Sequence, residues 1–128
     1  MIFGWQYSVV ASLLYAVICS GVIVFQICLI CGAPWGRITQ GGTHPKSLPI
    51  SGRVFAGVSI ILLAVMAGSI LSAAGLWPNW PRWLGWSALG IQAISTLLNW
   101  ITPSRSERLL WAPVTTIMFA LAALVLLA

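Results

Sequence analysis

The chain alternates between long runs of apolar residues and short polar stretches. The runs cover residues 8–33, 54–76, 83–101 and 104–128, the last beginning with a short polar turn. Each approaches the roughly 20 residues that a helix needs to cross a bilayer. Polar and apolar residues do not alternate within them as they would in barrel strands, and a bilayer requires backbone groups to be bonded internally. Each run is therefore predicted to be an α-helix.

Composition places these helices in a membrane. Apolar residues make up 60% of the chain and charged residues 5%, whereas soluble domains average about 25% charged residues. Each predicted helix also has a face of small or polar residues, which is how helices pack together in lipid. The expected fold class is all-α: one integral membrane bundle of four transmembrane helices over residues 1–128, its first run a helix and not a cleaved signal peptide.

The basic residues predict how the bundle is oriented. Five of the six lie in the first and third loops, and Arg82 is the exception. Short loops rich in Lys and Arg face the cytoplasm, which predicts an N-out and C-out topology. The pI of about 9.9 is explained by the same residues, because basic loops beside anionic headgroups are what this topology requires. No nucleic-acid partner is expected.

The first loop suggests a site for an anion or a lipid headgroup. Backbone amides of a Gly-rich turn, with basic side chains nearby, can hold a phosphate. A compact connector at the basic side of the membrane is the alternative. The hypothesised site comprises Arg37, Gly41, Gly42, His44, Lys46, Arg53, Arg105 and Arg108.

A dense aromatic cluster separates the second and third runs. It consists of Trp77, Trp80, Arg82 and Trp83. Such residues are typical of the membrane interface, so a rigid interfacial turn is expected. Cation–π contacts of Arg82, and a platform for a lipid or ligand, are the alternative.

A polar stripe marks the third run. At 100° per residue its polar side chains share one face, and one residue of the first run lies at a similar depth. They either bond between helices or line a small polar cavity open toward the cytoplasm. The candidate residues are Gln26, Gln92, Ser95, Thr96 and Asn99.

The inventory of reactive residues argues against several activities. The cores of the four runs lack ionisable residues, which disfavours proton coupling and predicts an uncharged cavity lining. His44 and Glu107 are the only residues of their kinds, so no acid–base pair, metal site or cofactor is expected. Glu107 fits a capping box with Ser104, in which its carboxylate reaches back to the Ser104 amide, or it pairs with a nearby basic residue.

The cysteine pair Cys28 and Cys31 forms a C-x-x-C motif at the end of the first run. Membrane disulfide oxidoreductases use such pairs on the oxidising side, together with further cysteines. Here the pair is predicted at the reducing side and away from the small-residue face, so inert apolar thiols are expected.

Three stretches resemble a group of small bacterial four-helix inner-membrane proteins to which no activity is assigned. They are GAPWG at residues 32–36, a GGxH…LP…R pattern over 41–53 and a TPSRSER…W-x-P pattern over 102–113. The resemblance implies the four-helix fold and a bacterial inner membrane, and it transfers no site residues.

Three functions remain open. The first is a non-enzymatic membrane protein that contacts lipids, or a membrane partner, through its basic cytoplasmic loops. The alternative is a small transporter or channel for a neutral or weakly charged solute, in which a homo-oligomer is one option. A thiol redox protein using Cys28 and Cys31 is the third.

Overall fold

The computed structural model describes the backbone of residues 2–44 and 46–128, and the side chains from residue 6 onward apart from residue 45. All regular structure in these residues is helical, which confirms the all-α prediction. The elements are α1 (Ile2–Ile30), the short 3-10 helices η1 (Gly36–Ile38) and η2 (Gln40–Gly42), α2 (Ile50–Ala73), α3 (Arg82–Ile101) and α4 (Arg105–Leu127).

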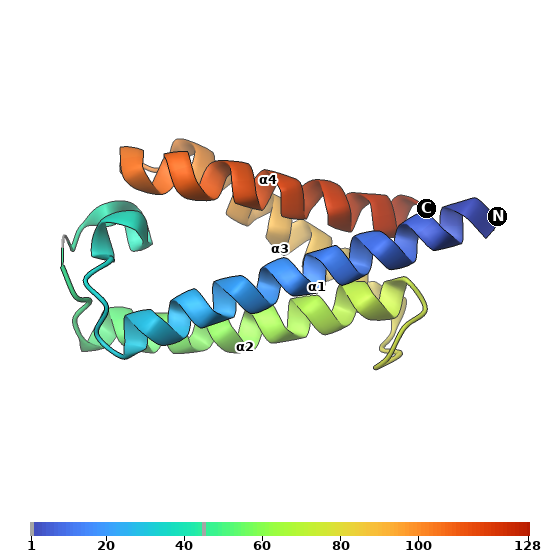
Figure 1. The fold of residues 1–128 in the computed structure, drawn as a ribbon, viewed down its shortest axis with the longest axis horizontal. Coiled ribbons are helices and arrows are strands. Elements are labelled where there is room, and N and C mark those ends of the chain that lie inside the picture. Colours follow the sequence, from blue (N-terminus) through green and yellow to red (C-terminus); the bar gives the residue numbers. More distant parts are fainter. Residues whose placement is uncertain (1, 45) are drawn as a thin grey trace.

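The four long helices form a bundle in which every neighbour is antiparallel (Figure 1). Helix α1 packs against α2 and α4, and α3 packs against the same two helices from the other side. The described ends of the chain lie together at one end of the bundle. The connections at residues 31–49 and 102–104 lie together at the opposite end, which we call the loop end.

Glycines in the left-handed backbone conformation end two helices earlier than the apolar pattern predicts. Gly32, with φ of 101°, follows α1, and Ala33 N–H donates to the Cys28 carbonyl. Gly75, with φ of 88°, follows α2, and Leu76 N–H donates to the Leu71 carbonyl. These bonds satisfy the last helical carbonyls and reverse the chain, so α1 ends at residue 30 and α2 at residue 73.

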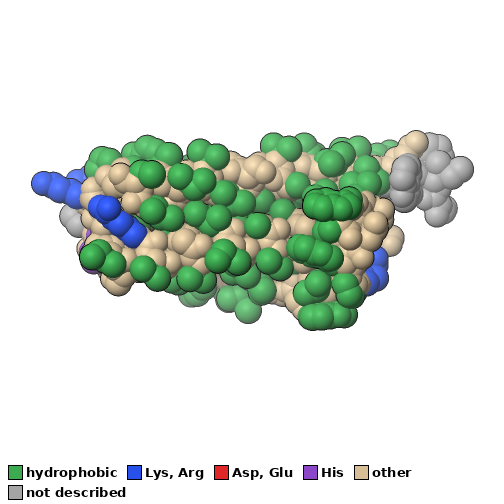
Figure 2. Space-filling model, turned by 90° about the horizontal axis from the view of Figure 1, so that it is seen from below, with side chains coloured by type: hydrophobic (Ala, Val, Ile, Leu, Met, Phe, Trp, Pro, Cys, Tyr) green, Lys and Arg blue, Asp and Glu red, His purple; other side chains and the backbone are tan. Residues whose placement is uncertain are grey.

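Three of the helices are long and apolar enough to cross a membrane: Gln6–Ile30, Ile50–Ala73 and Arg105–Leu127. Helix α3 is 20 residues long and is not one of these three. On the face shown in Figure 2, hydrophobic side chains cover the flank of the bundle, and the basic side chains lie at its two ends. This distribution fits a protein whose flank meets lipid.

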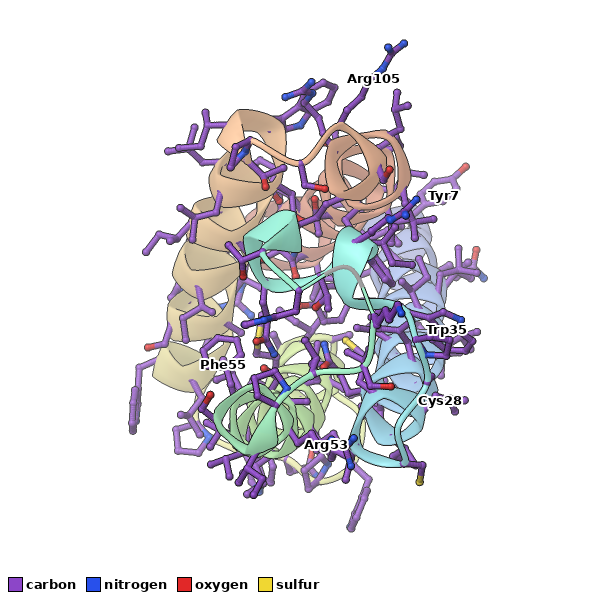
Figure 3. All side chains as sticks on the ribbon, turned by 90° about the vertical axis from the view of Figure 1, so that its left-hand side faces the viewer. Tyr7, Cys28, Trp35, Arg53, Phe55 and Arg105 are labelled. Atoms are coloured by element: carbon purple, nitrogen blue, oxygen red, sulfur yellow. The ribbon has the colours of Figure 1, made fainter. Side chains whose placement is uncertain are left out.

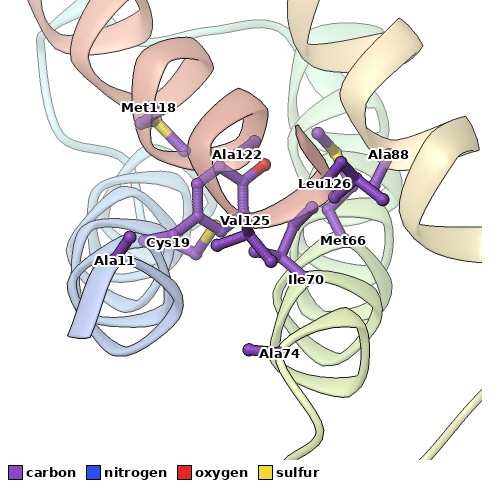
Figure 4. Close-up of a cluster of buried hydrophobic side chains, with 11 residues drawn as sticks. Ala11, Cys19, Met66, Ile70, Ala74, Ala88, Met118, Ala122, Val125 and Leu126 are labelled. Carbon is purple, nitrogen blue, oxygen red and sulfur yellow. The ribbon is translucent and has the colours of Figure 1, made fainter. Parts of the chain in front are cut away.

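The main core fills the half of the bundle away from the loop end (Figure 4). Small residues let the helices approach there: a Cβ on Gly85 would lie 3.1 Å from the Ala73 Cβ. The buried residues of this main core are Ala11, Tyr15, Cys19, Met66, Ile70, Ala74, Ala88, Met118, Ala122, Val125 and Leu126. This tight packing contrasts with the other half, which encloses a cavity.

Candidate binding cavity and its loop cap

A cavity of about 230 Å³ lies between the four helices, toward the loop end. Every long helix contributes to its wall, and the first loop contributes one residue. The lining consists of Val22, Phe25, Gln26, Thr39, Phe55, Ser59, Leu62, Leu63, Met66, Ile91, Gln92, Ser95, Asn99, Glu107, Trp111, Thr115 and Met118.

The lining is apolar at its inner end, and at its loop end it mixes polar groups with aromatic rings. Met66 and Met118 belong to the buried core and form the apolar end. Thr39 comes from the first loop and Glu107 from the first turn of α4, so they form the loop end of the wall. A molecule that fills this space therefore meets apolar side chains on one side and polar groups on the other.

Four of the five residues in the predicted polar stripe line this cavity: Gln26, Gln92, Ser95 and Asn99. The fifth, Thr96, points its hydroxyl to the Gln92 and Thr115 carbonyl oxygens, at 2.8 and 3.0 Å. The residues of the stripe therefore have two different roles: Thr96 bonds between helices, and the other four line the cavity.

Gln92 both bonds between helices and lines the cavity. It is almost completely buried, and Tyr15 OH donates to its Oε1 at 2.9 Å. Its Nε2 donates to the Thr115 carbonyl oxygen at 3.3 Å. The amide thus connects α1, α3 and α4, and interhelical hydrogen bonds of this type contribute about 0.6–2 kcal/mol in lipid.

Asn99 leaves an acceptor for the cavity. Its Nδ2 donates to the Ser95 carbonyl oxygen at 2.8 Å, within α3. Among the described residues, no donor reaches its Oδ1, and the side-chain amide lines the cavity. The Oδ1 of this lining residue is therefore not used as an acceptor by the described part of the protein.

The cavity opens on the flank of the bundle between α2 and α3. Phe55, Leu62 and Ile91 line it and are exposed, at 60, 41 and 37%. Figure 3, which looks onto the loop end, places Phe55 on this flank between the two helices. At the loop end, where the sequence predicts the opening, the lining residues Thr39 and Glu107 are buried.

A segment of the first loop, residues 36–42, closes the loop end, and we call it the loop cap (Figure 3). Gly41 N–H donates to Glu107 Oε2 at 2.8 Å. Ser104 Oγ donates to the Arg37 carbonyl oxygen at 2.7 Å, and Trp111 Nε1 donates to the Ile38 carbonyl oxygen at 2.6 Å. The loop cap is therefore fastened to the start of α4 at three points.

Glycine is required at two positions of the loop cap. A Cβ on Gly36 would lie 1.7 Å from the His44 carbonyl oxygen, which no real side chain tolerates. Gly42 has φ of 71°, and its Cβ would lie 2.7 Å from the Ser104 side chain. The Gly-rich composition of the loop thus reflects close packing of its own backbone.

Glu107 forms only half of the predicted capping box. The Ser104 Oγ accepts from Glu107 N–H at 3.2 Å, as expected. The carboxylate accepts from Gly41 in place of the Ser104 amide, whose N–H donates to Thr102 Oγ1. The expected uncharged lining is also not found, because the loop cap holds this carboxylate at the cavity wall.

Aromatic rings close the cavity on the side of α1 and α4. Phe25 stacks on Trp35 with ring centroids 5.6 Å apart. Phe25 also meets Trp111 edge to face at 4.9 Å. Phe25 and Trp111 both line the cavity, so this cluster separates it from the opposite flank.

Two residues of the hypothesised anion site turn inward. Arg53 Nε donates to the Leu48 carbonyl oxygen at 2.9 Å, and its Nη1 donates to the Ile30 carbonyl oxygen at 3.4 Å. Arg108 Nη1 donates to the Thr102 carbonyl oxygen at 2.9 Å. A cation near helix-terminal carbonyls is stabilising, so both guanidinium groups have structural partners.

The backbone part of the anion site is also engaged within the protein. Gly41 N–H is bonded to Glu107, and Gly42 N–H donates to the Thr39 carbonyl oxygen at 2.9 Å. The remaining candidates are exposed on the loop end, and the anion hypothesis therefore depends on them. They are Arg37, His44, Lys46 and Arg105.

The aromatic cluster at the opposite end forms a packed turn. Arg82 Nη1 donates to the Ala73 carbonyl oxygen at 3.2 Å, and Nη2 donates to the Leu126 carbonyl oxygen at 2.9 Å. The guanidinium thus caps α2 and α4 and is directed to carbonyl groups. Trp80 packs where a Cβ on Gly68 would lie 2.5 Å from its ring. Trp77 and Trp83 are exposed, as expected for interfacial residues.

The cysteines are free thiols. Cys19 is buried, Cys28 is half-buried and Cys31 is exposed. Figure 3 shows Cys28 on the outer side of α1, away from the cavity. The described residues hold no group of three or more His, Cys, Asp or Glu side chains that could ligate a metal ion.

Protein-family models, curated proteins and solved structures provide no match to this chain. The likeness to small bacterial inner-membrane proteins therefore stays a prediction, and function is argued from the cavity and the loop end alone.

Proposed function

We propose that the protein binds a small amphipathic molecule between its helices and takes it from the bilayer. The observation that carries this proposal is a mainly apolar cavity with polar groups at its loop end, open on the flank between α2 and α3. Concave sites with mainly apolar walls and a few converging polar groups are typical of ligand sites. The protein would act by binding or moving this molecule, without chemistry of its own.

The proposal includes a membrane topology. Helix α3 is 20 residues long, and at 1.5 Å per residue it reaches about 30 Å, the thickness of the hydrocarbon layer. Its polar residues face the bundle interior, which supports a fourth crossing. Five basic residues belong to the loop end, so we place this end in the cytoplasm of a bacterial inner membrane, N-out and C-out.

A cavity-filling variant tests the proposal. Ser95 lines the cavity and its side chain makes no described hydrogen bond, so Ser95→Leu should occupy the space with little effect on the helix. Ser87→Leu is the matched control, because Ser87 is exposed on the same helix. The probe is a hexanol derivative with a diazirine on its chain.

The expected result is photolabelling of the wild-type protein and of Ser87→Leu at cavity residues, with labelling lost in Ser95→Leu. Equal labelling of all three proteins would show that the probe meets only the lipid-facing surface, and the proposal would then be wrong.

A second role of the loop end is supported by its exposed basic side chains. Arg37, Lys46 and Arg105 are exposed, and each basic residue near an anionic membrane surface contributes about 1 kcal/mol. We propose that they contact anionic lipid headgroups or an acidic membrane partner. Co-purification of phosphatidylglycerol should fall when all three are replaced by Gln, and unchanged lipid content would contradict this role.

A further inference from the structure

We infer that the ligand of the cavity is a small primary amine with an apolar body, whose ammonium group binds at Glu107. This inference rests on the proposed function and adds the chemical class of the ligand. Glu107 is the only acidic residue of the chain, and it lies at the polar end of the cavity. The hydrogen bonding of the Glu107 carboxylate and the polar groups around it both favour a cationic ligand.

The carboxylate of Glu107 has acceptor capacity to spare. An ionised carboxylate offers about four lone-pair positions on its two oxygens. Gly41 N–H occupies one position on Oε2, and no described residue donates to Oε1. Buried side-chain oxygens and nitrogens without a partner are not found among the described residues, so Oε1 is accessible, and Glu107 lines the cavity. A cationic donor is the strongest partner for such an oxygen.

Neighbouring polar groups provide further acceptors. Asn99 commits its Nδ2 to the Ser95 carbonyl and leaves Oδ1 for the cavity. The Gln26 side chain lines the same space and has no described hydrogen bond within the protein. An ammonium group has three donors and no acceptor. One carboxylate and two amide oxygens match that requirement.

The charges around the cavity exclude an anion. The lining contains no Lys, Arg or His side chain. Arg53 and Arg108 are turned to backbone carbonyls, and Figure 3 shows Arg105 extending away from the bundle. An anionic ligand would face a carboxylate at low dielectric, where like charges repel strongly. A cation instead neutralises a buried charge that otherwise carries a desolvation penalty.

The size and the access route fit a short apolar body. An apolar cavity of about 150 Å³ binds benzene, and drug-sized ligands need about 300–1,000 Å³. The present volume of about 230 Å³ lies between these limits. The apolar body would lie against Met66 and Met118, and the opening between α2 and α3 lets an amine enter without crossing the basic loop end.

Three probes that share a hexyl tail separate the contribution of the headgroup from that of the tail: hexylamine, hexanol and heptanoate. Binding to the detergent-solubilised protein is followed by tryptophan fluorescence, because Trp111 lines the cavity. Hydrogen bonds to charged groups predict that hexylamine binds about tenfold or more tightly than hexanol. Heptanoate should bind more weakly than hexanol.

The variant Glu107→Gln removes the charge and keeps an oxygen that accepts from Gly41. We expect hexylamine to lose its advantage in this variant while hexanol binding is retained. Equal binding of hexylamine and hexanol to the wild-type protein, a preference for heptanoate, or an amine preference that survives in Glu107→Gln would each overturn the inference and leave the proposed function standing. Failure of all three probes to bind would overturn both the inference and the proposed function. If Glu107→Gln does not fold, the comparison of the three probes on the wild-type protein still tests the inference.

Discussion

The hydrogen bond between Tyr15 and Gln92 gives the sharpest test of the bundle interior. Tyr15 is 0% exposed and Gln92 is 2% exposed, and the bond that joins them is 2.9 Å long. Tyr15→Phe keeps the ring and leaves Gln92 Oε1 without a donor. A buried polar group left unpaired costs about 1–3 kcal/mol in proteins, but interhelical bonds in membrane proteins average about 0.6 kcal/mol because the denatured state in lipid finds other partners. We therefore expect a loss of about 1 kcal/mol in the free energy of unfolding.

A double-mutant cycle isolates the pair. Gln92→Met removes the amide at similar volume, and the double variant should lose less than the sum of the single variants. The coupling should lie between about 0.6 and 1.7 kcal/mol. Unfolding is measured by titrating dodecyl sulfate into detergent micelles and following tryptophan fluorescence. Tyr7→Phe is the matched control, since Tyr7 is 66% exposed. If Tyr15→Phe and Tyr7→Phe have the same effect, or if the coupling is zero, the interhelical role of Gln92 is refuted.

Three further variants are measured in the same unfolding assay. Gly36→Ala should cost about 2–3 kcal/mol, because a Cβ there would lie 1.7 Å from a carbonyl oxygen. A Cβ on Gly21, in the interior of α1, would have no atom within 4 Å, so Gly21→Ala should be neutral or stabilising by up to about 1 kcal/mol; equal effects of the two variants would contradict the packing of the loop cap. Arg82→Met should cost about 1.5–3 kcal/mol through the loss of two bonds to helix-terminal carbonyls, and a change below about 0.5 kcal/mol would show that the caps do not form in the solubilised protein. Replacing Cys28 and Cys31 together by Ser should change the stability by less than about 0.5 kcal/mol and leave hexanol binding intact; lost binding would point to a role for the thiols.

The apolar pattern predicts the helices well because a bilayer permits little else. Long apolar runs without alternation must form helices, and four helices are found. The ends are less predictable from hydropathy, since Gly32 and Gly75 stop α1 and α2 inside their apolar runs through left-handed turns. The predicted polar stripe of α3 does face the bundle interior, because helical spacing places Gln92, Ser95 and Asn99 on one side.

The role of Glu107 could not be predicted in the same way. Its local sequence signals a capping box, and half of that box forms. The competing partner, Gly41, is 66 residues away in the chain, so only the meeting of the first loop with α4 reveals it. The same holds for Arg53 and Arg82, whose acceptors belong to other helices. Long-range backbone carbonyls leave no signature in the sequence.

The central claim, a bound small amphipathic molecule, is tested most directly by native mass spectrometry of the protein released from its own membranes. The account predicts one small-molecule adduct on the wild-type protein and on Ser87→Leu, and its loss from Ser95→Leu, whose side chain would project into the cavity of about 230 Å³ and obstruct it. Bare protein in all three samples, or adducts of phospholipid mass that do not differ between the two variants, would contradict it.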